Sequence, residues 1–427
     1  MASWVTKVVE ELVAPCEPTP CATLPLSSID YALGLAFMEE IIFVYPNNNP
    51  EHRLQDMSVP VAKVIREALA KALVLYYPVA GRLVSSDGDH VEVACNGEGV
   101  WFIEATVTNC GLGDMNDLES IRPSVVKEKL LPSSPAHLKE EEMIMMMQVT
   151  HFQCGGFTVG LKFNHLVFDG LGFGQFLKAI GEIACGQTHP SVNPIWCREA
   201  ISVPPMLPKS FSFPITTKFD IAISTYDFSI QTIKRLKEQI AKETSNDQFT
   251  TFEVVAAILW KCRTQAINAI GDVSLSFAAN VRHLLDQLPK AGYYGNCIYF
   301  LTVTATSEQI MKASIAELVR FIRDAKESLP TKFKAWASGN FKEDPYKLSI
   351  SYNNMFLTDW RSIEFYQTDY GWGMPHFVSP IIHDIPVVVG VILKQPLPED
   401  GVHFEGQAVM KEHEQRFISE INKCINF

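Results

Sequence analysis

The segment that most constrains the fold of this chain is Gly160–Gly174, which reads GLKFNHLVFDGLGFG. An apolar run ends at Asn164, a glycine-containing turn follows, and helical periodicity begins near Leu171. His165 stands at the strand end beside that turn, where an imidazole can reach a substrate. We therefore expect a strand–turn–helix unit, with His165 as the leading candidate for a general base.

The spacing of His165 and Asp169 occurs a second time, at His52 and Asp56. That copy lies in the polar stretch 46–56, which is rich in turn residues and has no apolar strand directly before it. We interpret it as a solvated loop, so local context favours His165. Taken alone, Asp169 is also compatible with a solvated turn residue, and His165 with a hydrogen-bonded core histidine.

Length and charge exclude several classes of protein. The 427 residues predict two domains, and a net charge of −12 argues against nucleic acid as a partner. No apolar run approaches the roughly 18 residues of a membrane span, and the N-terminus lacks the apolar core of a signal peptide. We therefore expect a cytoplasmic protein without a membrane partner.

The ten cysteines include no Cys-x-x-Cys pair, and no His/Cys cluster has the spacing of a zinc site. Reduced thiols and the absence of a metal are the expectation. The methionine-rich run 143–147 is interpreted as packed core in preference to a binding site.

Helical and strand patterns interleave along the chain without a strict βαβ rhythm, and Gly155-Gly156 is a hairpin signal. We therefore predict an α/β protein with mixed sheets, not one doubly wound parallel sheet. Helices are expected at 61–73, 171–184, 229–244, 252–269, 307–329 (ending at Pro330) and 411–425. Strands are expected at 41–45, 90–95, 100–106, 142–151, 157–164, 275–279, 348–355, 386–393 and 402–410.

The segment 191–214 is rich in proline and serine and is the best candidate for an interdomain linker. The predicted division is an N-terminal domain over 1–195, a linker over 196–214 and a C-terminal domain over 215–427.

Several familiar catalytic motifs are missing, including the Gly-x-Ser-x-Gly elbow, the phosphate-binding P-loop and the His-Glu-x-x-His helix. What remains is a histidine base with no serine or cysteine nucleophile at motif spacing. This favours direct transfer, in which the base deprotonates an acceptor hydroxyl or amine that attacks an activated acyl group.

A second stretch, Thr368–Pro375, reads TDYGWGMP. With the His165 motif it closely resembles the plant acyl-CoA-dependent acyltransferases known as the BAHD family. The family patterns are His-x-x-x-Asp-Gly and Asp-Phe-Gly-Trp-Gly, and Tyr370 replaces the Phe here. Four further family elements occur in the family's order: PCEPTP (15–20), LSSID (26–30), YYPVAGR (76–82) and GYYGN (292–296).

The resemblance implies two chloramphenicol-acetyltransferase-like domains, each a mixed sheet with flanking helices. The active-site channel lies at their interface, and a segment around 365–390 crosses back to the first domain. His165 would be the base, with acyl-CoA entering from one side and the acceptor from the other.

The resemblance also implies roles for other residues. Asp169 would turn away from the channel and pair with Arg282, although Asn280 stands where many relatives have Asp. The loop residues Asp369, Gly371, Trp372 and Gly373 would be structural and near the CoA side. Candidates on the CoA side are Thr251, Gly295 and Asn296, and candidates for the acceptor pocket are Phe43, Thr358 and Trp360.

The expected reaction moves an acetyl, benzoyl or hydroxycinnamoyl group from CoA to a hydroxyl, in preference to an amine, of a plant specialised metabolite. Acyl-CoA would be a co-substrate, with no permanently bound cofactor and a monomeric enzyme. Met374 stands where relatives acting on shikimate or quinate often carry Arg, so the acceptor is expected to be less charged. The chain looks similar to the benzyl alcohol and taxane acyltransferase branch.

Two alternatives stay open. A carrier-protein condensation domain shares the fold and uses His-His-x-x-x-Asp-Gly, but Asn164 stands where its first histidine belongs. A catalytically inactive relative that only binds small molecules would keep the fold without the reaction.

Overall fold

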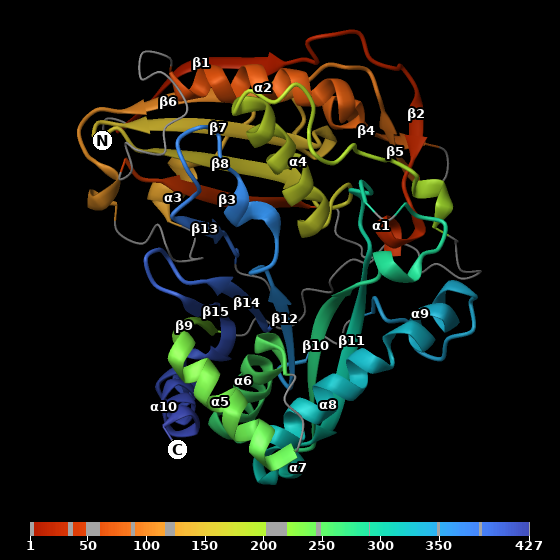
Figure 1. Cartoon of the computed structure of the whole chain (residues 1–427), viewed down its shortest axis with the longest axis vertical. Coiled ribbons are helices and arrows are strands. Elements are labelled where there is room, and N and C mark those ends of the chain that lie inside the picture. The colour runs from red at the N-terminus through yellow and green to blue at the C-terminus, as the bar shows by residue number, and fades with distance from the viewer. Residues whose placement is uncertain are drawn as a thin grey trace.

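Two six-stranded mixed sheets form the upper and lower halves of the molecule (Figure 1). The computed structural model describes residues 4–32, 37–47, 60–86, 90–115, 124–201, 220–244, 249–289, 291–347, 351–383 and 387–426. The first sheet has the strand order β1-β6-β7-β8-β3-β13, and the second has the order β11-β10-β12-β14-β15-β9. A small third sheet, β2-β5-β4, borders the first half.

The strands of the first half are β1 (Val5–Val13), β2 (Thr23–Pro25), β3 (Met38–Tyr45), β4 (Arg82–Ser86), β5 (His90–Ala94), β6 (Val100–Val107), β7 (Met145–Phe152), β8 (Phe157–Asn164) and β13 (Phe377–Pro380). Those of the second are β9 (Ile221–Ser229), β10 (Asp272–Asn280), β11 (Ile298–Thr306), β12 (Asn354–Asp359), β14 (Val389–Lys394) and β15 (Gly401–Met410). Parallel pairs (β6–β7, β10–β12, β12–β14) occur beside antiparallel ones, so the predicted mixed sheets are confirmed.

The helices are α1 (Ser28–Ala32), α2 (Val61–Leu75), α3 (Val125–Leu130), α4 (Gly170–Ala184), α5 (Ile230–Thr244), α6 (Thr251–Ala266), α7 (Ser307–Lys312), α8 (Ile315–Glu327), α9 (Leu329–Ala337) and α10 (Glu414–Ile425). Among the described residues, no helix is both long and apolar enough to cross a bilayer.

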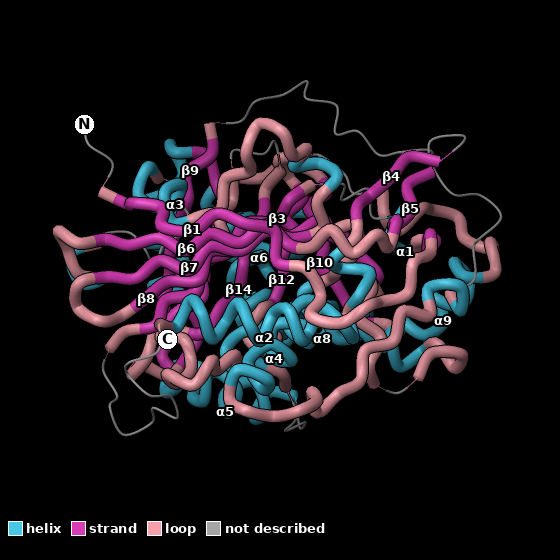
Figure 2. Tube along the Cα trace, turned by 90° about the horizontal axis from the view of Figure 1, so that it is seen from above, coloured by secondary structure: helices cyan, strands magenta, loops and turns pink. Residues whose placement is uncertain are grey.

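Helices α2 and α4 cover one face of the first sheet (Figure 2). Phe173, Phe176, Leu177 and Ile180 of α4 recur at helical spacing and are all fully buried, which is why this segment forms an amphipathic helix against the sheet. The methionines of 143–147 are at most 1% exposed, so the prediction of packed core is confirmed.

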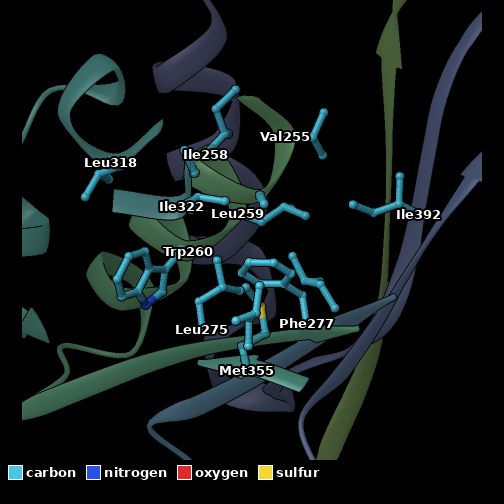
Figure 3. Packing of buried hydrophobic residues seen from close by; sticks show 14 of the residues in the cluster. Val255, Ile258, Leu259, Trp260, Leu275, Phe277, Leu318, Ile322, Met355 and Ile392 are labelled. Carbon is cyan, nitrogen blue, oxygen red and sulfur yellow. The ribbon is translucent and has the colours of Figure 1, made fainter. Parts of the chain in front are cut away.

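The core of the second half lies between its sheet and the helices α5, α6, α8 and α10 (Figure 1). Helix α6 is buried on nearly every face, and Trp260 and Leu259 pack near Leu275 and Phe277 of β10 (Figure 3). The buried charged residues of α6 are paired, with Glu253 accepting from Lys326 and Arg323, and the Arg263 Nε donating to the Ala408 carbonyl.

One strand leaves its sequence neighbours to join the other sheet. β13 lies in the chain between β12 and β14 of the second sheet, yet it pairs with β3 at the edge of the first, with Phe377 opposite Val44. At the other connection, Ile195 forms a bridge with Tyr293, and 202–214 of the expected linker falls outside the described residues. His52 and Asp56 also lie outside them.

The helix predicted over 307–329 is wrong. Thr306 and Ser314 each cap a new helix through a reciprocal bond with Gln309 or Glu317, so the segment is divided into α7 and α8. Pro330 does not end the helix either, because it occupies the first turn of α9, where its missing N–H costs nothing.

The strand predicted over 348–355 is displaced, since β12 begins at Asn354. Strand β11 was missed. Its last five residues alternate only between exposed and partly buried positions, which is a weak signal for a strand. The strand forms by antiparallel pairing with β10, a contact that the local sequence does not indicate.

Candidate active site

The turn after β8 holds His165 in place by backbone contacts on both sides. The His165 N–H donates to the Phe37 carbonyl at 3.0 Å, and the Leu166 N–H donates to the Asn164 side chain at 3.1 Å. Asp169 then caps α4 by accepting from the Gly172 N–H at 2.8 Å. Gly172 is required, because a Cβ there would overlap the Tyr294 carbonyl.

The His165 imidazole lies beside two aromatic rings and keeps part of its surface exposed. Its centroid is 5.9 Å from that of Phe37 and 6.2 Å from that of Phe163. Burial lowers the pKa of His165 below its ordinary value of 6.5, against smaller opposing effects of its own backbone, Asp169, Asn296 and Asp30. The imidazole is therefore neutral at neutral pH, which is the form that accepts a proton.

Asp169 faces Arg282, not the imidazole. The guanidinium donates two bonds of 2.8 Å to the carboxylate, which also accepts from the Cys297 N–H at 2.9 Å. Burial alone would raise the pKa of Asp169, but Arg282 and the backbone donors outweigh it and lower the pKa below its ordinary value. This ion pair ties the His165 turn to the second half of the chain.

Asn280, which replaces an Asp of many relatives, still takes part. Its side-chain oxygen accepts from the Arg282 N–H at 3.1 Å and from the guanidinium at 3.3 Å. A neutral amide therefore orients Arg282 without competing with Asp169 for its charge.

A second buried ion pair, between Asp30 and Arg198, lies beneath the same turn and was not recognised in the sequence as part of the site. The Arg198 Nε donates to Asp30 at 3.0 Å, and both side chains are fully buried. Arg198 also donates to the Val167 carbonyl and stacks 3.5 Å from the Trp196 ring centroid. The LSSID element carried a signal for Asp30, but nothing nearby indicated its partner.

Asn296 connects this pair to His165. Its amide donates to Asp30 at 2.8 Å and to the His165 carbonyl at 2.9 Å, and the residue is fully buried. Asn296 therefore lies underneath the His165 turn. Among the described residues, the buried His165 Nδ1 and Asn296 Oδ1 atoms each lack a hydrogen-bond partner of good geometry.

The other two residues predicted on the CoA side have protein contacts. Gly295 is buried between the Tyr293 ring and Arg198, where a Cβ would clash, and its carbonyl accepts from Arg282 at 2.7 Å. Thr251 opens α6 and accepts from Lys237 Nζ at 3.0 Å.

The loop Asp369–Gly373 folds around its own carboxylate. Asp369 accepts from the N–H groups of Gly371 at 2.7 Å and Gly373 at 2.9 Å, and both glycines have a positive φ. Trp372 packs edge-on against Phe157 at 6.2 Å, and the buried Tyr370 ring lies 5.7 Å from that of Tyr45. The loop comes after β12 of the second sheet in the chain, but its aromatic side chains pack against β3 and β8 of the first sheet.

The three residues predicted for the acceptor pocket differ in exposure. Phe43 is fully buried and packs edge-on against Phe365 at 5.6 Å. Thr358 and Trp360 are half-buried at the end of β12, and Trp360 packs against the same Phe365 at 5.5 Å. Trp360 contacts the core of the first half and a small cluster formed by Phe377 of β13 with Val391 and Leu393 of β14, which places it at the junction of the two halves.

No group of three or more His, Cys, Asp or Glu side chains suited to a metal ion occurs in the described ranges. At the candidate site, the described residues place a neutral imidazole on a turn that two buried ion pairs support.

Comparisons with known proteins give the family. The profile of the Transferase family matches residues 3–420. Acyl transferase 4 of Oryza sativa is 38% identical, and the match covers 98% of both chains. Myricetin 3-O-glucosyl 1,2-rhamnoside 6'-O-caffeoyltransferase AT2 of Crocosmia x crocosmiiflora is 39% identical over 99% of both. A Taxus canadensis 3'-N-debenzoyl-2'-deoxytaxol N-benzoyltransferase is 33% identical over 88% of this chain and 85% of its own.

Solved structures share the fold. Vinorine synthase superposes with a TM-score of 0.76 over 98% of both chains, at 21% identity. F. graminearum TRI101 complexed with coenzyme A and deoxynivalenol superposes with a TM-score of 0.64, at 14% identity, over 94% of this chain and 98% of its own. With the family profile and the full-length plant relatives, these findings identify the chain as an acyltransferase of the BAHD family.

Proposed function

We propose that the protein is an acyl-CoA-dependent O-acyltransferase in which His165 is the general base. The observation that carries the proposal is a neutral, partly exposed imidazole at a strand end, with its neighbouring carboxylate fully engaged by Arg282. A base of this kind needs an open side and no permanent carboxylate partner that would keep it protonated.

In the proposed reaction, His165 takes the proton of an acceptor hydroxyl as the oxygen attacks the thioester carbonyl carbon of acyl-CoA. The tetrahedral intermediate collapses by breaking its carbon–sulfur bond. The departing CoA thiolate takes the proton from the His165 imidazolium, so the ester and free CoA leave and the base is regenerated. No covalent acyl-enzyme is required.

Support for CoA as the donor comes from the fold, because TRI101 was crystallised in complex with coenzyme A. Support for a neutral acceptor comes from Met374, which follows the DYGWG loop and is 59% exposed. A thioether offers no charge to clamp a carboxylate, so an uncharged alcohol of plant specialised metabolism is the proposed acceptor class. Acetyl, benzoyl and hydroxycinnamoyl groups are the proposed acyl groups.

Release of free CoA from a panel of acyl-CoAs and alcohols tests the proposal. The His165→Ala variant should lose at least about 100-fold in turnover, because a positioned base typically contributes that much or more. Binding of CoA, measured by calorimetry, and the melting temperature should stay near those of the wild type. Retained turnover in this variant would exclude His165 as the base.

The same assay separates the alternatives. An inactive binding protein would bind ligands without releasing CoA. A condensation domain would use an acyl group on a carrier protein in place of acyl-CoA.

A further inference from the structure

A carboxyl group that the proposed mechanism does not use lies close to the catalytic turn. Glu39 belongs to β3, and its register partner on β8 is Phe163, whose ring lies 6.2 Å from the His165 imidazole. Residues paired in register project from the same face of a sheet, so the Glu39 side chain leaves β3 on the face that carries Phe163. Glu39 is only two residues from Phe37, the other ring beside His165.

The opposite side of Glu39 faces the junction of the two halves. Pro380 pairs with Ile41, and the Ile381 N–H donates to the Glu40 carbonyl, so the chain continues with Ile382 alongside Glu39. Ile382 and Trp360 pack against the same small cluster of buried residues. Glu39 therefore lies between Phe163, beside His165, and Ile382, beside the cluster that Trp360 contacts.

Within the part of the chain that the structure describes, the Glu39 side chain makes no hydrogen bond or ion pair. Its neighbour Glu40 projects from the other face and is paired with Lys162 at 2.9 Å and with His383 at 2.8 Å. Burial raises the pKa of Glu39 to about 7, Glu40 adds to this, and His383 opposes it. The Glu39 side chain is largely removed from water but keeps some accessible surface. A bound molecule can therefore reach its carboxyl group and supply the hydrogen-bond donor that the described residues do not.

We propose that Glu39 selects acceptors that carry a second hydroxyl, by accepting a hydrogen bond from it while the first hydroxyl faces His165. The inference rests on the proposed function, since it assigns a specificity role within the same site. The exposed Phe37 ring beside His165 and the half-buried Trp360 ring bind the apolar part of such an acceptor, and the ionised Glu39 carboxylate repels acceptors that carry a carboxylate. The acceptor class is thus a neutral diol or polyol.

The test compares acceptors that differ only in whether the second oxygen can donate. Meta-hydroxybenzyl alcohol and meta-methoxybenzyl alcohol form one such pair, and further diols with their mono-methyl ethers extend it. Acetyl-CoA, benzoyl-CoA and caffeoyl-CoA serve as donors. Above pH 7, where the Glu39 carboxyl is ionised, the wild type should prefer the free hydroxyl by about 10-fold or more in kcat/KM, as one hydrogen bond to a charged group provides.

Three variants make the test specific. Glu39→Leu should remove the preference, and Glu39→Gln should keep part of it, because the amide oxygen still accepts. Glu40→Gln, on the same strand but the opposite face, should leave the preference unchanged. Circular dichroism checks that each variant folds. If Glu39→Leu does not fold, the isosteric variant Glu39→Gln still tests the proposal.

Calorimetric binding of each acceptor pair to His165→Ala measures the same preference without turnover. An unchanged preference in both Glu39 variants, with turnover present, would overturn the role of Glu39 and leave the proposed function intact. Absence of CoA release with every donor and acceptor would overturn the proposed function itself.

Discussion

His165 and His403 both lie where the two halves of the molecule meet, but their surroundings leave the first neutral and the second positively charged. Burial lowers the pKa of His165, whose neighbour Asp169 is turned toward Arg282. His403, on β15, donates to Asp227 at 2.8 Å and lies 3.5 Å from Glu405, and its ring packs edge-on against Phe377 of the first sheet. Burial would lower the pKa of His403, but the two carboxylates raise it to about 9.

The difference lies in where the carboxylates point. A histidine held between two carboxylates stays protonated at neutral pH and serves as a cation that joins β15 to β9. A histidine whose nearest carboxylate is neutralised by an arginine stays neutral and can act as a base. Arg282 is therefore as important to the state of His165 as the residues that contact the imidazole.

The largest expected effect comes from removing Arg282. Arg282→Gln leaves the buried Asp169 carboxylate without its cation, so the free energy of unfolding should fall by about 3 kcal/mol or more. The freed charge should also raise the pKa of His165, which moves the acid limb of kcat/KM to higher pH. Urea unfolding and a pH profile of acyl transfer measure the two effects.

Arg361→Gln is the matched control, because Arg361 and Asp359 form a pair of similar length that is about one-fifth exposed on each side. Its loss should cost at most about 1 kcal/mol. Equal losses of unfolding free energy in the two variants would contradict the larger contribution expected of the Asp169–Arg282 pair.

A smaller effect is expected from His403 at alkaline pH. Because its folded pKa of about 9 exceeds the ordinary value of 6.5, its contribution is complete below 6.5 and is lost as pH rises through about 9. The free energy of unfolding should fall by on the order of 2 kcal/mol across that window. His403→Gln should flatten this slope, and a slope that persists in the variant would contradict the assignment.

The smallest effect is the pH dependence of the wild-type reaction. Since the pKa of His165 is lowered, kcat/KM should be constant at neutral pH and decline only below 6.5. Initial rates at fixed ionic strength measure it. If kcat/KM began to decline above pH 6.5, the pKa of His165 would be raised, like that of His403, and not lowered as its burial indicates.

Much of the local structure followed from short-range patterns. The β8–turn–α4 unit could be predicted because an apolar run, a capping Asp169 and helical spacing all occur within 15 residues of Gly160. The Asp369 loop could be predicted because glycines at 371 and 373 allow the positive φ that it adopts. Errors came where capping inside a helical pattern divided it, as at Ser314.

The amino-acid sequence by itself determined the strand–turn–helix unit around His165, the mixed sheets and the family, because these depend on local periodicity and on motifs that are contiguous in the chain. Only the tertiary structure decided the partners of Asp30, the pairing of β13 with β3 and the lack of a partner for the Glu39 side chain among the described residues. Asp30 and Arg198 are 168 positions apart, and no local rule relates them. The charge of each histidine was decided in the same way, since a pKa depends on which distant groups the fold brings within a few ångströms.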